Sequence, residues 1–159
     1  PEMPALIVFG PFIDRERRRG FEERIGRIRQ LDALSFDTKI ERLMEKAAAI
    51  VAMGGYNTFC EILSLDKRAL IVPRTRPRLE QHIRAVEAER LGLARMLSEA
   101  GGERDPLRMA EALRALPEQP RPSEVTVPGL LAGLDAIRTR FGAMLDTGRK
   151  GAPFSLAAE

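Results

Sequence analysis

The chain has 159 residues, of which 44% are hydrophobic and 31% are charged, and its formal net charge is +3. This length favours one domain with a sizeable core, and this composition excludes a chain that is disordered throughout. The arginines are interleaved with glutamates, and there is one tyrosine and no tryptophan. A nucleic-acid-binding tract and a stacking platform for single strands are therefore not expected.

A membrane-spanning segment and an internal disulfide are also not expected. No apolar stretch approaches the roughly 20 residues of a membrane-spanning helix, and the first residues lack the charged region of a signal peptide. The single cysteine, Cys60, cannot form an internal disulfide or a cysteine zinc site. We expect a cytoplasmic protein, with peripheral contact at the inner membrane face only through a part that this chain does not contain.

Apolar runs alternate with helical patterns along the first hundred residues. The sequence predicts strands at 5–9, 32–36, 49–53, 69–73 and 93–97, and helices at 13–28, 37–47, 58–65 and 78–91. The strands show no polar alternation, and helices separate them. This pattern is typical of an α/β fold whose parallel sheet is covered on both faces, and we predict an open doubly wound sheet.

The character of the sequence changes in the last third of the chain. Asp105 and Pro106 predict the cap and first position of a helix that ends near residue 116, which closes a domain at 1–116. A proline-rich connector is expected at 117–128. The helix predicted at 129–146 carries an apolar stripe, which we expect to pack on the domain in preference to a partner's groove. Residues 147–159 are expected to fray.

A double glycine marks the most distinctive junction. Gly54 and Gly55 separate an apolar strand from a helix, and glycine lets backbone N–H groups approach a ligand closely. The positive end of the following helix makes such a junction a ready site for a diphosphate. The alternative needs no ligand, because Thr58 and Glu61 fit a capping box that satisfies the N–H groups of the helix start.

Other loops are expected at the same edge of the sheet. Ligands of doubly wound sheets bind at the carboxyl ends of the strands, where Gly10, Phe36, Gly54 and Arg74 all lie. Arg74, Arg76 and Arg78 could neutralise a diphosphate or reach an anionic acceptor, or they could form a solvated basic loop.

Two further side chains have a reactive and a structural interpretation. Cys60 near a helix start could be a nucleophile, but a small buried packing residue is the better interpretation. His82, the only histidine, is interpreted as a surface or packing residue in preference to a base.

The residues of this region resemble the donor-binding half of GT-B glycosyltransferases. The resemblance lies in Met-Gly-Gly-Tyr-Asn-Thr-Phe-Cys-Glu-Ile-Leu at 53–63, Ala-Leu-Ile-Val-Pro-Arg at 69–74 and Arg-Leu-Glu-Gln-His at 78–82. The closest type is the lipid II N-acetylglucosaminyltransferase family, glycosyltransferase family 28, with its bacterial relatives. The resemblance covers about residues 5–100, is most specific over 50–85, and implies a Rossmann-like lobe of a GT-B fold.

The resemblance implies a role for each matching residue. Glu61 would accept hydrogen bonds from ribose hydroxyls, and Glu80 or Gln81 would bind hydroxyls of the donor sugar. Phe36 and Ile40 would wall the nucleobase, which backbone near Asp37 would read. The first loop would come close to the phosphates at Gly10. The diphosphate and the proximal ribose would be lined by Gly54, Gly55, Tyr56, Asn57 and Thr58.

The implied reaction moves a hexosyl group from a nucleoside-diphosphate sugar, with UDP as the expected nucleotide, to an acceptor that the sequence leaves open. The resemblance implies no metal and no other cofactor. The acceptor site and the general base would belong to an N-terminal lobe, or to a separate acceptor subunit, so no catalytic residue is assigned here. The chain alone is expected to be inactive, whether it is a cut fragment or a natural half-enzyme.

Departures from the family pattern keep alternatives open. Tyr56 and Asn57 replace smaller or apolar residues, and Glu80 replaces a glutamine, so the donor base and sugar stay open. A nucleotide-sugar hydrolase or epimerase on the same scaffold would use a base near Glu80 and His82. A non-catalytic interaction module would associate through the apolar stripe at 130–144.

Overall fold

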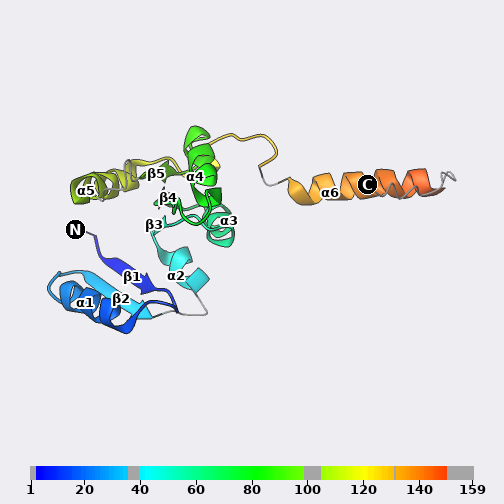
Figure 1. The fold of residues 1–159 in the computed structure, drawn as a ribbon. Helices are drawn as coiled ribbons and strands as arrows, with labels where there is room; N and C mark the ends of the chain where they lie inside the picture. The colour runs from blue at the N-terminus through cyan, green and yellow to red at the C-terminus, as the bar shows by residue number, and fades with distance from the viewer. Residues whose placement is uncertain (1–2, 36–39, 99–104, 131, 150–159) are drawn as a thin grey trace. The chain divides into compact units, whose positions relative to one another are not determined.

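The computed structural model describes residues 3–35, 40–98, 105–130 and 132–149, with side chains up to residue 145 (Figure 1). The chain divides into two compact units, Pro1–Pro122 and Ser123–Glu159. Each unit is described here by itself. All the residues predicted to bind a ligand belong to the first unit.

The first unit begins with a strand–helix–strand element. Strand β1 (Ala5–Phe9) pairs in parallel with β2 (Leu31–Ser35), and α1 (Arg15–Ile25) connects them. Asp14 caps α1, because its carboxylate accepts the backbone N–H groups of Glu16 and Arg17 at 3.0 and 3.1 Å. Phe9 and Ile25 are buried, so the apolar side of α1 lies against this sheet.

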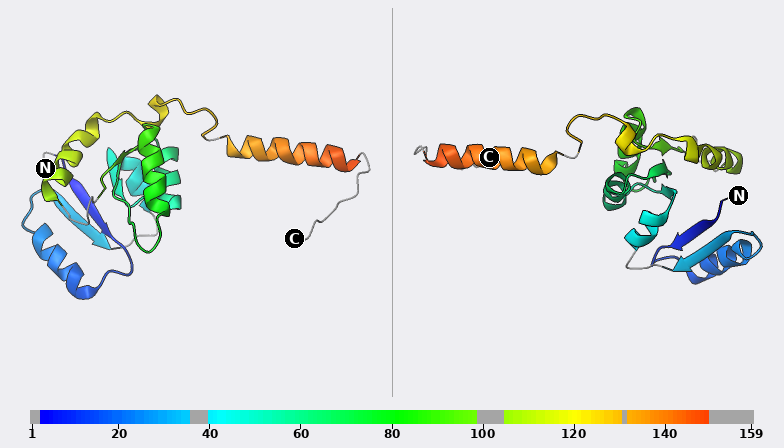
Figure 2. Two further views of the ribbon diagram at one scale, coloured as in Figure 1. Left: turned by 45° about the horizontal axis from the view of Figure 1, so that its top comes forward. Right: turned by 180° about the vertical axis from the view of Figure 1, so that it is seen from behind.

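A second parallel sheet follows, in the order β3-β4-β5. Its strands are β3 (Ala49–Ala52), β4 (Arg68–Ile71) and β5 (Arg95–Met96), and its helices are α3 (Tyr56–Ser64) and α4 (Glu80–Arg90). The core of this part comes from β4 and the helices and includes the fully buried side chains of Ile62, Leu70 and Ile71. Helices α3 and α4 lie side by side (Figure 2).

The short helix α2 (Ile40–Lys46) precedes β3. The Lys67 ammonium group, just before β4, donates to the carbonyl groups of Glu45 and Ala47 at 2.6 and 3.0 Å. These bonds satisfy carbonyl groups at the end of α2 that have no partner within the helix, and they tie α2 to the second sheet.

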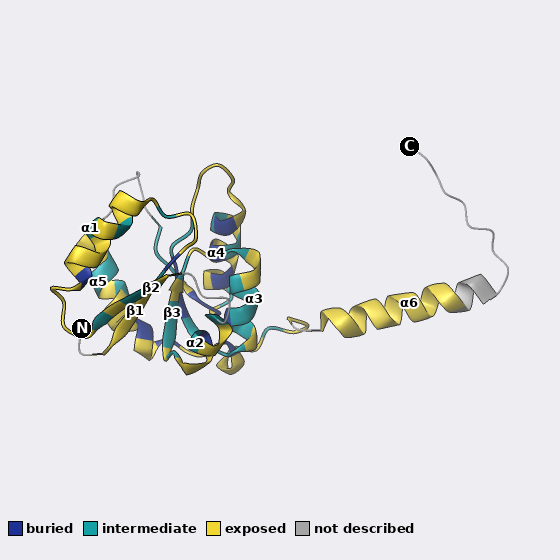
Figure 3. Cartoon of the chain, turned by 90° about the horizontal axis from the view of Figure 1, so that it is seen from below, coloured by how far each residue is buried: buried dark blue, intermediate teal, exposed yellow. Residues whose placement is uncertain are grey.

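The predicted α/β class with parallel strands is confirmed, but the strands lie in two sheets. β1 pairs only with β2, and β3 pairs only with β4 among the described strands. Apolar residues expected to be buried are therefore accessible, such as Leu6 with 44% and Val51 with 47% of its surface exposed (Figure 3). The hydrophobic pattern predicts that a segment is a strand, but it does not determine which other strand will pair with it.

The end of the first unit packs beside β4. Helix α5 (Pro106–Ala115) has the predicted cap, since Asp105 accepts the Leu107 N–H at 2.8 Å and Pro106 holds the first helical position. Two 3₁₀ turns, Leu116–Glu118 and Pro122–Glu124, interrupt the predicted connector. The Arg68 guanidinium donates to the carbonyl of Gln119 at 2.5 Å, which fixes this segment to β4.

The second unit contains one long helix, α6 (Gly133–Arg149). Its apolar stripe is exposed within the unit, with Leu134 at 82% and Phe141 at 63%. The expected packing of this stripe on the domain stays a prediction, and the predicted tail from residue 150 onward lies outside the described residues. No helix among the described residues is both long and apolar enough to cross a bilayer.

Candidate functional site

The turn after β3 needs glycine at its first position. Gly54 has φ +75°, and a Cβ atom there would lie 2.7 Å from Cγ2 of the buried Ile71. Both the left-handed backbone and the close packing against β4 therefore exclude a side chain. Gly55 has ordinary dihedral angles, and nothing lies within 4 Å of the position of its Cβ, so the space above it is open.

Helix α3 begins immediately after this turn. Gly55 is the N-cap, no side chain caps the helix, and the first backbone bond of the helix runs from Phe59 N–H to the Gly55 carbonyl at 2.9 Å. The backbone N–H groups of Tyr56, Asn57 and Thr58 precede that bond and have no acceptor within the helix. They form a positive end with open space in front of Gly55.

The capping-box alternative is wrong. The sequence predicted a helix start at Thr58, but α3 starts at Tyr56. The left-handed turn at Gly54 redirects the chain early, so that Thr58 and Glu61 lie inside the helix. Their side chains cannot cap its first N–H groups, and those groups remain available to a ligand.

Sequence reasoning missed Arg84. Its Nη1 atom donates to the Gly54 carbonyl at 2.7 Å, and its guanidinium carbon lies 5.6 Å from the centre of the Tyr56 ring. Arg84 thus connects α4 to the glycine turn and to the first residue of α3. One signal pointed to it, because Arg84 follows Gln81 by three residues and shares its helix face.

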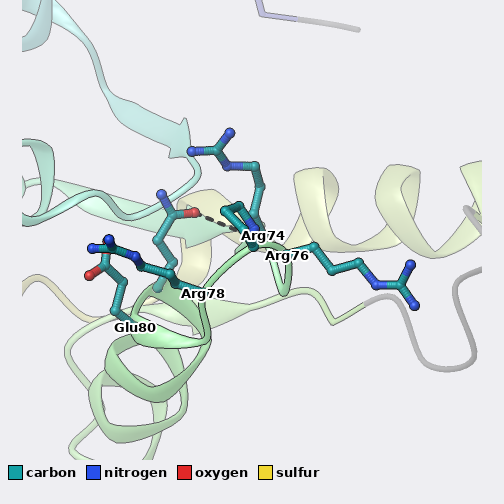
Figure 4. A pocket seen from close by; sticks show the side chains of 6 residues that line it. Arg74, Arg76, Arg78 and Glu80 are labelled. Carbon is teal, nitrogen blue, oxygen red and sulfur yellow. Dashed lines mark hydrogen bonds between the residues drawn. The ribbon is translucent and has the colours of Figure 1, made fainter.

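A second group of residues surrounds a hollow between β4 and α4. The hollow is open to solvent, has a volume of about 100 Å³ and is lined by Arg74, Arg76, Pro77, Arg78, Glu80 and Gln81. Gln81 is only 9% exposed, and its carbonyl oxygen accepts the backbone N–H of Arg74 at 3.1 Å (Figure 4). This bond fixes the shape of the loop beside the hollow.

The structure brings the predicted residues together in two groups. One group is the glycine turn with Tyr56, and the other is the hollow with Arg74, Glu80 and Gln81. Glu61 is half-buried on α3, Ile40 begins α2, and Gly10 follows β1 with open space around it. Phe36 and Asp37 lie outside the described residues, so the base-binding wall stays a prediction.

The two side chains with a reactive interpretation are not among the residues that line the hollow. Cys60 is a half-buried free thiol. His82 has a buried Nδ1 atom without a hydrogen-bond partner among the described residues, and it does not line the hollow. The described side chains contain no group of three or more that would hold a metal ion.

The parallel strands and intervening helices define an α/β protein. The uncapped helix start behind two glycines is a candidate anion site at the carboxyl ends of its strands. Residues 6–125 match the glycosyltransferase family 28 C-terminal domain, and the chain belongs to this family. Membership of this family implies, in general terms, a sugar-donor-binding domain of a glycosyltransferase and an N-terminal partner lobe. No curated protein matches the chain.

Proposed function

We propose that this domain holds a nucleoside-diphosphate sugar, with UDP as the nucleotide, while its hexosyl group is transferred to an acceptor. The observation that carries the proposal is the uncapped start of α3 behind Gly54 and Gly55. The free N–H groups of Tyr56, Asn57 and Thr58 would bind the diphosphate. Arg84 holds this turn through the Gly54 carbonyl.

The neighbouring side chains would bind the rest of the donor. We assign the ribose hydroxyls to Glu61, which is half-buried one turn further along α3. Glu80 and Gln81 at the hollow would bind the sugar hydroxyls, since carboxylate and amide oxygens accept and the amide nitrogen donates. Phe36, Ile40 and backbone near Asp37 would enclose the base.

The reaction itself would need a second lobe. We propose that the acceptor and the general base come from the N-terminal lobe of a GT-B enzyme, or from a separate acceptor subunit, so that this chain alone has no transfer activity. The leaving diphosphate would be stabilised by helix N–H groups and basic side chains without a metal ion. The free thiol of Cys60 suits a reducing, cytoplasmic setting.

The proposal is tested by calorimetric titration of the chain with UDP, GDP, TDP and ADP. We expect saturable binding of UDP that is at least about tenfold weaker in Glu61→Ala, because a hydrogen bond to a charged group contributes about 1.5–3 kcal/mol. Glu111→Ala, which removes an exposed carboxylate from α5, is the matched control and should bind as the unchanged chain does. Binding of none of the four nucleotides would refute the proposal.

A further inference from the structure

The hollow between β4 and α4 contains more positive charge than its surroundings neutralise. Three arginines, Arg74, Arg76 and Arg78, line it together with one carboxylate, that of Glu80. Among the described residues, none of the three guanidinium groups has a carboxylate within ion-pair distance. An anionic ligand at the hollow would neutralise this excess of positive charge.

The backbone adds to this positive potential. Helix α4 begins at Glu80, and its N-cap, Leu79, makes no side-chain cap bond. The positive end of an eleven-residue helix therefore lies at the hollow. This end is separate from the start of α3, to which we assign the diphosphate.

Gln81 provides a second kind of observation. Its side chain is 9% exposed and lines the hollow, and its oxygen is already engaged by the Arg74 N–H. Its amide nitrogen has no hydrogen-bond partner among the described residues. The nitrogen is not among the buried atoms that lack a partner, so it is a solvent-accessible donor at the wall of the hollow. Such a donor suits a ligand that carries an acceptor oxygen.

We infer that this hollow binds a second anionic group, a carboxylate or a phosphate, located beside the transferred sugar and distinct from the donor diphosphate. Arg74 and Arg78 bind its charged oxygens, since a guanidinium group forms paired bonds with carboxylate or phosphate. Arg76 extends away from the other labelled side chains (Figure 4). The inference rests on the proposed function and names the substrate class: an acidic donor sugar or an acidic acceptor.

The first arm of the test uses donors that differ only in charge. The chain is titrated with UDP, UDP-glucose and UDP-glucuronate. If the anion belongs to the donor sugar, UDP-glucuronate binds at least about tenfold more tightly than UDP-glucose, the size of one charge-assisted hydrogen bond. The preference disappears in the Arg74→Gln/Arg78→Gln double variant. The Arg108→Gln/Arg114→Gln variant, which removes two exposed charges from α5, is the charge-matched control and retains it.

The second arm tests the acceptor as the source. The UDP-saturated chain is titrated with free glucuronate and glucose 6-phosphate, with glucose as the neutral control. Binding of either anion, absent for glucose and lost in the double variant, assigns the group to an acceptor. In both arms the anion preference weakens as salt rises, because the site is open to solvent.

Two outcomes overturn the inference while leaving the proposed function intact. One is equal affinity for UDP-glucose and UDP-glucuronate with no binding of either free anion. The other is a double variant that weakens UDP as much as UDP-glucuronate, since the arginines would then serve the diphosphate. Binding of no nucleotide at all would refute the proposed function itself.

Discussion

Gly55 is the N-cap of α3 and supplies no capping side chain. It has the extended dihedral angles of an N-cap, with φ −56° and ψ 153°, yet it carries no side chain to accept the N–H groups that follow. Serine at this position would accept one of those groups. The absence of a cap therefore costs local stability and leaves the helix start open to a ligand.

Replacing Gly55 with serine should separate stability from binding. We expect Gly55→Ser to raise the free energy of unfolding by a few tenths of a kcal/mol, because a serine cap is slightly better than glycine. UDP affinity should fall severalfold, because the hydroxyl competes with the diphosphate for the same N–H groups. Urea unfolding and calorimetry measure the two quantities.

Gly55→Ala distinguishes the two ways in which serine could act. Alanine adds the same Cβ atom, which meets nothing within 4 Å, but it adds no hydroxyl. If alanine weakens UDP binding as much as serine does, the Cβ atom obstructs the ligand, and competition of the serine hydroxyl for the N–H groups of α3 is ruled out.

Among the elements, α4 holds the site together. Gln81 and Arg84 lie on one face of this helix, and each makes a bond to a loop that follows a strand. Gln81 fixes the backbone after β4, and Arg84 fixes the turn after β3. One helix thus sets the positions of both predicted groups of ligand-binding residues.

Arg84→Met tests this role of α4. Methionine keeps much of the side-chain volume but leaves the Gly54 carbonyl without its donor, so we expect a loss of about 1–2 kcal/mol in the free energy of unfolding. UDP affinity should fall severalfold because the turn is less well fixed. Arg90→Met removes an exposed arginine from the end of the same helix, where it pairs with Glu87, and should leave UDP affinity unchanged. A similar loss of affinity in both variants would contradict the positioning role.

The limits of sequence reasoning also appear at the level of elements. The strands and helices follow from hydrophobic period and turn residues, and the cap at Asp105 follows from side-chain chemistry. The start of α3 was predicted two residues late, because Thr58 and Glu61 match the sequence pattern of a capping box. The left-handed turn at Gly54 starts the helix before those residues. Arg84 was missed because its partner is a main-chain carbonyl, which no residue type reveals. The division of the strands into two sheets, in which β1 does not pair with β3, depends on contacts between distant strands, which local pattern does not contain.

At the scale of the whole molecule, we expect the apolar stripe of α6 to be buried against another protein surface. A helix of this length is only marginally stable by itself in water, yet Leu134 and Phe141 are 82% and 63% exposed. Two surfaces could bury it: the first unit of the same chain, or a second molecule. Packing on the first unit agrees with a donor-binding domain that ends in a packed helix. Packing on a second molecule agrees with an interaction module.

Leu134→Asp distinguishes these two possibilities, and we expect the stripe of α6 to pack on the first unit. Burying an unpaired carboxylate there should lower the free energy of unfolding by about 1–3 kcal/mol, independently of protein concentration. Ala136→Asp, which places the same charge on the opposite face of α6, should change it little. The measurements are urea unfolding at two concentrations and sedimentation of both variants. Unchanged stability of Leu134→Asp together with loss of a self-association that the unchanged chain shows would contradict packing, and the stripe would then be a contact between molecules.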